Sequence, residues 1–181
     1  MLKLEDNPPV LPKGVLAPSE LQGTWWVAHT KSRFEKAFAW DLLRADIGYF
    51  LPLMERVRIS GGRRRKLLAP LFTSYVFFCG DEEARYKAMA TDRLCQTIAI
   101  PDQGQFLSQI QTVYKALASN AQLDPYPFLA VGNRCRITAG PFMGVEGTVI
   151  SRDRRTQIVL EVSILGQAVV MEIDPSLLEA A

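Results

Sequence analysis

The sequence has few of the residues on which metal sites depend. Its 181 residues include one histidine, His29, and three cysteines, and no two cysteines form a C-x-x-C pair. Structural zinc sites draw their ligands from closely spaced cysteines and histidines, so no metal site is expected. Cys79, Cys95 and Cys135 each lie in an apolar or strand-like stretch. We expect all three to be small buried hydrophobic side chains.

A catalytic arrangement is also missing. The stretch HTKSR, which begins at His29, offers neither a carboxylate nor a nucleophile at a useful spacing. The adjacent acids Asp81, Glu82 and Glu83 are simply explained as residues at the start of a helix, where negative charge is favourable. We therefore expect a protein that is not an enzyme and that needs no cofactor.

Long apolar runs and excess charge are scarce too. No apolar run approaches the roughly 18 residues of a membrane span. The first twenty residues contain acids and four prolines where a secretory signal needs an uninterrupted apolar segment, so we expect a cytoplasmic protein. The net charge of +2 is too small for a chain-wide nucleic-acid binder. Any site for an anionic partner must therefore be local.

What the chain does have is enough apolar material for real cores, at 48% hydrophobic residues. Proline and turn residues divide it into four parts. We expect a disordered Pro-rich tail over 1–22, a first domain over 23–118, a linker over 119–127 and a second domain over 128–181. No internal repeat is visible.

The first domain alternates strand-like and helix-like segments. Runs of aromatic and β-branched residues predict strands, and apolar residues three and four apart predict helices. The expected strands are 24–30, 49–59, 69–79 and 95–100, and the expected helices are 34–45, 81–90 and 105–118. This order predicts an α+β fold, a sandwich of an antiparallel sheet and helices.

The second domain has the pattern of an all-β unit. NRCRIT, VEGTVIS, TQIVLEVSI and QAVVMEI read as four strands in about forty residues, which bury a core only if they close into a small barrel. Gly140, Gly144 and Gly147 would supply the sharp corners and close backbone approaches of such a barrel. A phosphate-binding loop is the rival interpretation, but no Gly-Lys-Ser/Thr follows and no helix begins here.

Two motifs resemble a known family. VGNRCRITAGPFMGVEGTVI resembles a KOW motif, and WWVAHTKSRFEKAFAWDLL followed by FLP and PLFTSYVFF resembles the N-terminal domain of NusG-family transcription elongation factors. The likeness spans about residues 24–178 and is nearest to the operon-specific, UpxY-type antiterminators. Where many relatives have Pro-Gly, this chain has Thr73-Ser74. The residues that match the KOW pattern are Arg136, Gly140, Pro141, Phe142, Gly144, Glu146 and Gly147.

The resemblance implies that the first domain binds the clamp helices of RNA polymerase through exposed aromatic residues. The matching positions are Phe72, Tyr75 and Phe77. Alternation along a strand places Tyr75 and Phe77 on one face and their neighbours on the other. The alternative is that helices 34–45 and 105–118 bury both faces.

A cluster of cations lies in RVRISGGRRRK. Its members, with no acid among them, are Arg56, Arg58, Arg63, Arg64, Arg65 and Lys66. A flexible Gly61-Gly62 tip could lay them against a phosphate backbone, and in the polymerase context the ligand would be upstream or non-template DNA. In this interpretation Lys31 and Arg33 extend the same surface. A solvated basic loop is the ordinary alternative.

Together these features predict a monomeric elongation or antitermination factor that suppresses pausing or termination. The resemblance implies that the KOW barrel recruits a second partner, such as the termination factor Rho or a ribosomal protein. Some relatives hold this region as a helical hairpin, but its glycines and β-branched residues favour strands. A ribosome-associated KOW protein that binds RNA remains the alternative, although the barrel has a balanced charge.

Overall fold

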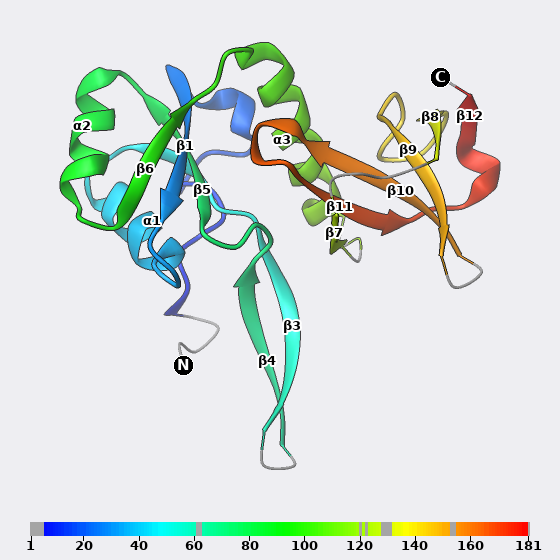
Figure 1. Ribbon diagram of the computed structural model, residues 1–181, viewed down its shortest axis with the longest axis horizontal. Coiled ribbons are helices and arrows are strands. Elements are labelled where there is room, and N and C mark those ends of the chain that lie inside the picture. The colour runs from blue at the N-terminus through cyan, green and yellow to red at the C-terminus, as the bar shows by residue number, and fades with distance from the viewer. Residues whose placement is uncertain are drawn as a thin grey trace. The chain divides into compact units, whose positions relative to one another are not determined.

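The computed structural model describes residues 6–60, 63–119, 121, 123–127, 132–152 and 155–180. The chain divides into two compact units, Met1–Gln103 and Gly104–Ala181. Both are drawn in Figure 1. Helix α3 (Gln103–Ala118) begins at the boundary and groups with the second unit.

The first unit is built on an antiparallel sheet in the order β2-β5-β1-β6. Its strands are β1 (Thr24–Thr30), β2 (Gly48–Phe50), β5 (Tyr75–Gly80) and β6 (Leu94–Ala99). Helices α1 (Glu35–Arg44) and α2 (Glu82–Ala90) bury their apolar sides in one core with alternate residues of these strands. Phe38 of α1 meets Phe78 of β5 edge to face, with ring centroids 6.2 Å apart. These elements confirm the α+β fold that the sequence predicts.

Two segments that read as continuous strands are in fact broken. Residues 49–59 divide at Leu51 and Pro52 into β2 and β3 (Leu53–Ser60), because a proline cannot donate to a strand ladder. Residues 69–79 divide at a turn over 71–74 that separates β4 (Arg63–Pro70) from β5. Strands β3 and β4 form a two-stranded sheet of their own, which we call the basic ribbon. It extends away from the four-stranded sheet (Figure 1).

The prediction of a disordered tail is wrong for residues 6–22. Residues 6–23, which we call the N-terminal strap, pack on the first unit, and Leu11 is buried. The Leu51 amide donates to the Val10 carbonyl over 2.9 Å, and the Tyr49 hydroxyl donates to the Pro9 carbonyl over 3.0 Å. These long-range contacts, rather than local secondary structure, order the strap. A periodic sequence pattern is therefore not needed here.

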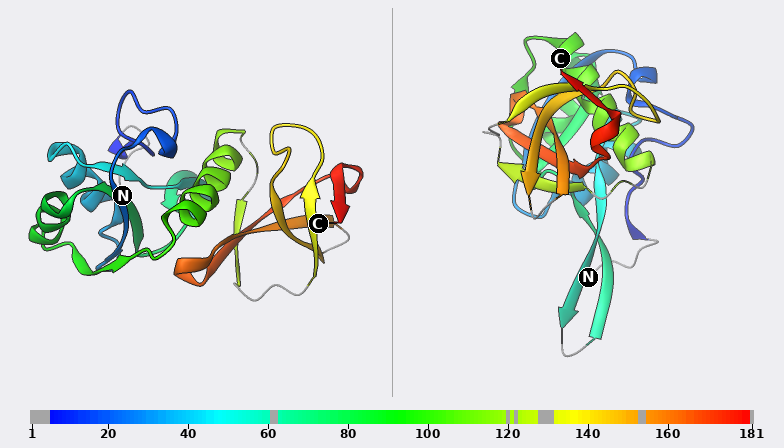
Figure 2. Two further views of the ribbon diagram at one scale, coloured as in Figure 1. Left: turned by 90° about the horizontal axis from the view of Figure 1, so that it is seen from above. Right: turned by 90° about the vertical axis from the view of Figure 1, so that its right-hand side faces the viewer.

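The second unit contains α3 and a six-stranded antiparallel sheet in the order β12-β8-β9-β10-β11-β7. Figure 2 shows this sheet curling around its core. The strands are β7 (Leu123–Pro127), β8 (Asn133–Ile137), β9 (Glu146–Arg152), β10 (Arg155–Val162), β11 (Gln167–Glu172) and β12 (Leu178–Ala180). The four predicted strands are present. Strand β7 pairs with β11 although the sequence placed it in the linker, and β12 is an addition.

The glycines of the second unit do what the sequence predicts. Gly140 and Gly144 have φ angles of +84° and +85°, which L side chains rarely adopt. A Cβ atom at Gly147 would lie 2.6 Å from the Val159 carbonyl oxygen, so only glycine permits this approach of β9 to β10. No helical hairpin forms here, since strands span most of the described residues from 133 to 180.

The cysteine prediction is correct at two positions and wrong at one. Cys79 and Cys135 are buried, and burial raises the pKa of the Cys79 thiol to about 11. Cys95 is exposed because it lies on β6, an edge strand of the sheet. Across the described residues, no group of three or more His, Cys, Asp or Glu side chains could hold a metal ion. Nor does this part of the chain contain a helix long and apolar enough to cross a membrane.

Candidate partner and nucleic-acid interface

The basic ribbon presents its cations on an exposed pair of strands. The side chains of Arg56, Arg64 and Lys66 are exposed. In the strand register Arg58 pairs directly with Arg65. Exposed cations that lie close together on one element create a local positive potential, which attracts anions. The ribbon is therefore suited to an anionic ligand.

One of the predicted cations is already paired within the ribbon. The ammonium of Lys66 lies 3.1 Å from a carboxylate oxygen of Glu55, an acid just before the predicted cluster. Both side chains are more than half exposed, so water screens the pair. The Gly61-Gly62 tip and the side chains of Arg58, Arg63 and Arg65 lie outside what the structure describes.

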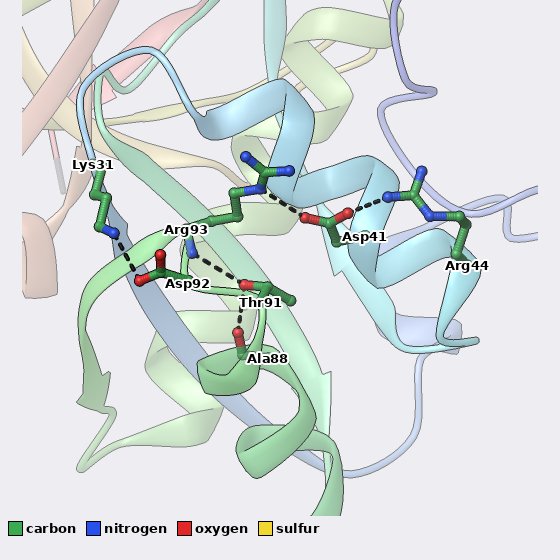
Figure 3. A network of polar contacts seen from close by, with 7 residues as sticks. All are labelled: Lys31, Asp41, Arg44, Ala88, Thr91, Asp92 and Arg93. Atoms are coloured by element: carbon green, nitrogen blue, oxygen red, sulfur yellow. Dashed lines mark hydrogen bonds and ion pairs between the residues drawn. The ribbon is translucent and has the colours of Figure 1, made fainter.

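A second group of cations lies where β1 leads into α1 and α2 leads into β6 (Figure 3). Lys31 lies 2.8 Å from Asp92 and, through this hydrogen bond, holds the pKa of the Asp92 carboxyl below its ordinary value. Asp41 pairs with Arg93 at 3.0 Å and also with Arg44. Lys31 is thus partly neutralised in the structure, and the carboxylate of Asp41 orients two guanidinium groups.

Arg33, the other cation predicted in this region, is exposed and has a φ angle of +66°. This left-handed backbone is uncommon for a residue other than glycine. Next to it, the ring of Phe34 carries the guanidinium of Arg93, 5.2 Å from the ring centroid. Cation–aromatic contact of this kind holds a charged group in place at a surface.

The predicted aromatic patch is divided between interior and surface. Phe77 is fully buried and Phe72 is 2% exposed. Phe77 stacks on Phe50 with centroids 6.0 Å apart and meets Phe72 edge to face at 5.9 Å. These two phenylalanines are therefore interior residues. Tyr75 alone of the three is half-buried.

Tyr75 forms a pair with the single histidine. The two residues are register partners on β5 and β1, and their rings stack with centroids 5.1 Å apart and an interplanar angle of 23°. His29 is likewise half-buried. The stack leaves two aromatic side chains partly open to a partner at this end of the sheet.

The turn before Tyr75 is held by a buried acid. Glu35 of α1 is 5% exposed, and its carboxylate accepts the Ser74 amide over 2.7 Å. The Ser74 carbonyl accepts the Thr30 amide over 2.8 Å. Ser74 has a φ angle of +66°, a left-handed backbone that favours glycine. Two long-range hydrogen bonds therefore hold this strained residue in place.

In the second unit, the KOW residues form a turn with an exposed tip. Gly140 and Pro141 begin the turn, Phe142 is half-buried and Met143 is 69% exposed. On the adjacent strands Arg136 donates to Glu146 over 2.6 Å. This hydrogen bond holds the pKa of the Glu146 carboxyl below its ordinary value. The pair joins β8 to β9 beside the turn.

Comparison with known families decides the assignment. A family model described as transcription termination factor nusG matches residues 23–120, and a model of the KOW motif matches residues 131–161. The chain belongs to the NusG family. The transcription termination/antitermination protein NusG of Rickettsia prowazekii (strain Madrid E) is 27% identical over 175 residues, covering 83% of this chain and 86% of that protein.

Two solved structures show weaker likeness to this NusG-family chain. One, titled for domain interaction in Thermotoga maritima NusG, has a TM-score of 0.48 and 17% identity and covers 88% of this chain and 97% of its own. The other, an MjSpt4:Spt5 complex, has a TM-score of 0.29 and 13% identity, with coverage of 87% and 96%. These scores are too low to add to the family match.

Sequence reasoning missed several residues of this NusG-family surface. Arg44 and Arg93 join Lys31 only through the fold, since Arg44 ends α1 and Arg93 directly precedes β6. His29 became part of the aromatic surface through its register with Tyr75. The exposed Met143 at the KOW turn could have been identified from the sequence, because it is an apolar residue in a turn between two glycines.

Proposed function

We propose that this member of a transcription elongation and antitermination family acts by holding RNA polymerase and nearby DNA in one complex. In this proposal the first unit binds the clamp helices of the polymerase, the basic ribbon contacts upstream or non-template DNA, and the KOW turn recruits a second partner. The protein carries out no chemistry. It suppresses pausing or termination because it binds the closed, processive state of the polymerase more tightly than the open one.

The proposed DNA contact rests on the structure of the basic ribbon. Two strands with exposed Arg56 and Arg64 extend from the unit, and Arg58 faces Arg65 in the register. A guanidinium group binds phosphate through charge-assisted hydrogen bonds that do not depend on base sequence. The proposed ligand is therefore a DNA backbone. Lys31 and Arg33, with Arg93, would extend the contact at the end of the sheet.

The polymerase part centres on Tyr75 and His29. Tyrosine is enriched among the residues that dominate binding at protein interfaces, and this tyrosine is half-buried in a stack that fixes its ring. A side chain held in one rotamer loses little entropy on binding. Phe72 and Phe77 would support the surface from beneath through their packing, rather than contact the partner themselves.

The KOW part rests on the exposed Met143 and its neighbour Phe142. A flexible thioether side chain beside an aromatic ring can adapt to an apolar pocket of a partner. We assign this turn to protein recruitment, with Rho or a ribosomal protein as the candidates that the family suggests. The flanking carboxylate of Glu146 pairs with both Arg136 and Arg134, which leaves little net charge beside the turn and favours a protein partner over RNA.

The test is the salt dependence of binding to a purified transcription elongation complex assembled on a DNA–RNA scaffold. A variant with Arg56→Gln and Arg64→Gln removes two exposed cations from the ribbon. If both touch phosphates, the slope of log K against log salt should fall by about 2 or less. Binding to polymerase without nucleic acid should be nearly unchanged.

A matched control removes the same charge elsewhere. Lys13 and Lys87 are exposed cations that belong to other elements, the strap and α2. A Lys13→Gln, Lys87→Gln variant should keep the wild-type slope. If the ribbon variant and the control give the same slope as the wild type, the ribbon does not contact DNA and this part of the proposal is wrong.

A further inference from the structure

The basic ribbon is attached to the first unit at a junction that also holds the N-terminal strap. Lys36, in the first turn of α1, donates from its ammonium to the side-chain oxygen of Asn7 and to the backbone carbonyl of Leu68, both over 2.5 Å. Asn7 belongs to the strap, and Leu68 lies near the base of the ribbon on β4. One side chain thus links three segments that are far apart in the sequence.

The surroundings of Lys36 fit a structural role for its charge. The side chain is half-buried, and burial lowers the pKa of its ammonium, opposed by the neighbouring carboxylate of Glu35. A partly buried ammonium is costly unless its donors are satisfied. Asn7 and Leu68 accept hydrogen bonds from this ammonium, so replacing the lysine removes both links and replacing the asparagine removes the link to the strap.

The residue before Lys36 holds the other end of the same segment. Glu35 accepts the Ser74 amide in the turn that leads from the ribbon to β5. The Leu71 amide also donates to the Pro52 carbonyl over 2.8 Å, which closes the base of the ribbon. The first turn of α1 therefore contacts the chain at two points on its return from the ribbon, at Leu68 on β4 and at Ser74 in the turn that follows.

Because the ribbon is long, a small rotation at this junction displaces its far end by several ångströms. A strand of eight residues spans roughly 26 Å, so a rotation of about 10° at the base moves the far end by about 4–5 Å. Successive nucleotides of one DNA strand rise by about 3.4 Å. A loose base would therefore shift Arg64, which lies near the far end of β4, by about the rise of one nucleotide.

We propose that Lys36 and Asn7 are positioning residues that fix the direction of the basic ribbon, with the N-terminal strap as the part that locks the junction. The mechanical claim stands on the contacts of the first unit alone. Its consequence for DNA binding rests on the proposed function. A preorganised ribbon loses less conformational entropy when it binds a phosphate backbone.

The direction of the ribbon can be measured by double electron–electron resonance on the full chain. One spin label replaces Val57, which is 51% exposed on β3, and the other replaces Tyr86, which is 63% exposed on α2. Cys95, the exposed thiol, is changed to serine, and the two buried cysteines are kept. The wild type should give a narrow distribution of label distances.

Lys36→Met keeps most of the alkyl stem and removes both hydrogen bonds, and Asn7→Ala removes one of them from the strap side. Both should widen the distance distribution, whereas Lys36→Arg, which keeps a charged donor, should restore a narrow one. The control Lys87→Met should not change the width. If Lys36→Met is too unstable to study, Asn7→Ala alone decides. An unchanged width in the folded variants overturns the proposal.

A second readout separates this inference from the DNA proposal. On a short DNA duplex, Lys36→Met should bind three- to tenfold more weakly with an unchanged salt slope, because the phosphate contacts remain but are less well placed. A lysine that only stabilises the fold would lower the melting temperature and leave both the width and the affinity of the folded protein unchanged. If the wild type does not bind DNA while the widths respond as expected, the positioning role stands and the DNA proposal fails.

Discussion

Replacing Phe77 by alanine should cost the first unit a large part of its stability. The ring is fully buried and packs against Phe50 and Phe72. Truncation of a buried phenylalanine to alanine costs about 3–5 kcal/mol, because the lost ring contacts leave a cavity. For a unit of about 100 residues, 1 kcal/mol lowers the melting temperature by roughly 4–8 °C, so a drop of about 12 °C or more is expected.

The matched variant is Tyr75→Ala, two residues away on the same face. Tyr75 is half-buried and has one aromatic partner, His29. We expect its truncation to cost less than that of Phe77, about 1–2 kcal/mol of stability, because part of the ring is already in contact with water. Its binding to polymerase should instead weaken by about 2 kcal/mol, or roughly 30-fold, the scale of an interface anchor.

Thermal unfolding followed by tryptophan fluorescence suits this comparison. The three tryptophans, Trp25, Trp26 and Trp40, all lie in the first unit, so the signal reports on that unit alone. A melting temperature of Phe77→Ala within a few degrees of the wild type would refute the buried position of Phe77. A larger drop for Tyr75→Ala than for Phe77→Ala would reverse the assignment of the two residues.

Three further outcomes follow from particular atoms. Gly80→Ala should lower the free energy of unfolding by about 1–3 kcal/mol, because the added Cβ would lie 2.5 Å from the Ala84 Cβ. Gly140→Ala meets open space and should cost about 1–2 kcal/mol through backbone strain alone, and thermal melts followed by circular dichroism measure both variants. Burial raises the pKa of Tyr49 to about 12, so stability should fall as the pH rises from about 10, the unfolded value, towards 12, and Tyr49→Phe should remove this component from melts across that range. Cys95 should react with a thiol reagent in the native protein, and the two buried thiols only after denaturation.

The sequence predicted the elements whose pattern is local. Strand β1 has the predicted bounds, and helices α1 and α2 begin and end within one residue of theirs. Apolar spacing defines the buried side of α1, and the acids at the start of α2 mark that helix. The N-terminus of α2 was readable from Asp81, which caps it by accepting the Ala84 amide. The alternation along β5 was also right, since Val76 and Phe78 join the core with α1.

The features that sequence could not predict depend on distant partners. The turn at Ser74 interrupts a run with high strand propensity, and it is held by Glu35, 39 residues away. The strap has no pattern of its own and is ordered by Tyr49 and Leu51. Whether the second face of β5 is open or buried could not be decided either, because strand alternation gives the side of a residue and not what covers it.

The central claim is that this NusG-family protein binds the transcribing polymerase. The most direct measurement adds the full-length protein to a bacterial RNA polymerase elongation complex halted at a defined pause site, and records both binding and the lifetime of the pause. The account predicts a stoichiometric complex with a shortened pause, and weaker binding by the Tyr75→Ala variant. No binding to the elongation complex, together with association with purified ribosomes, would contradict it.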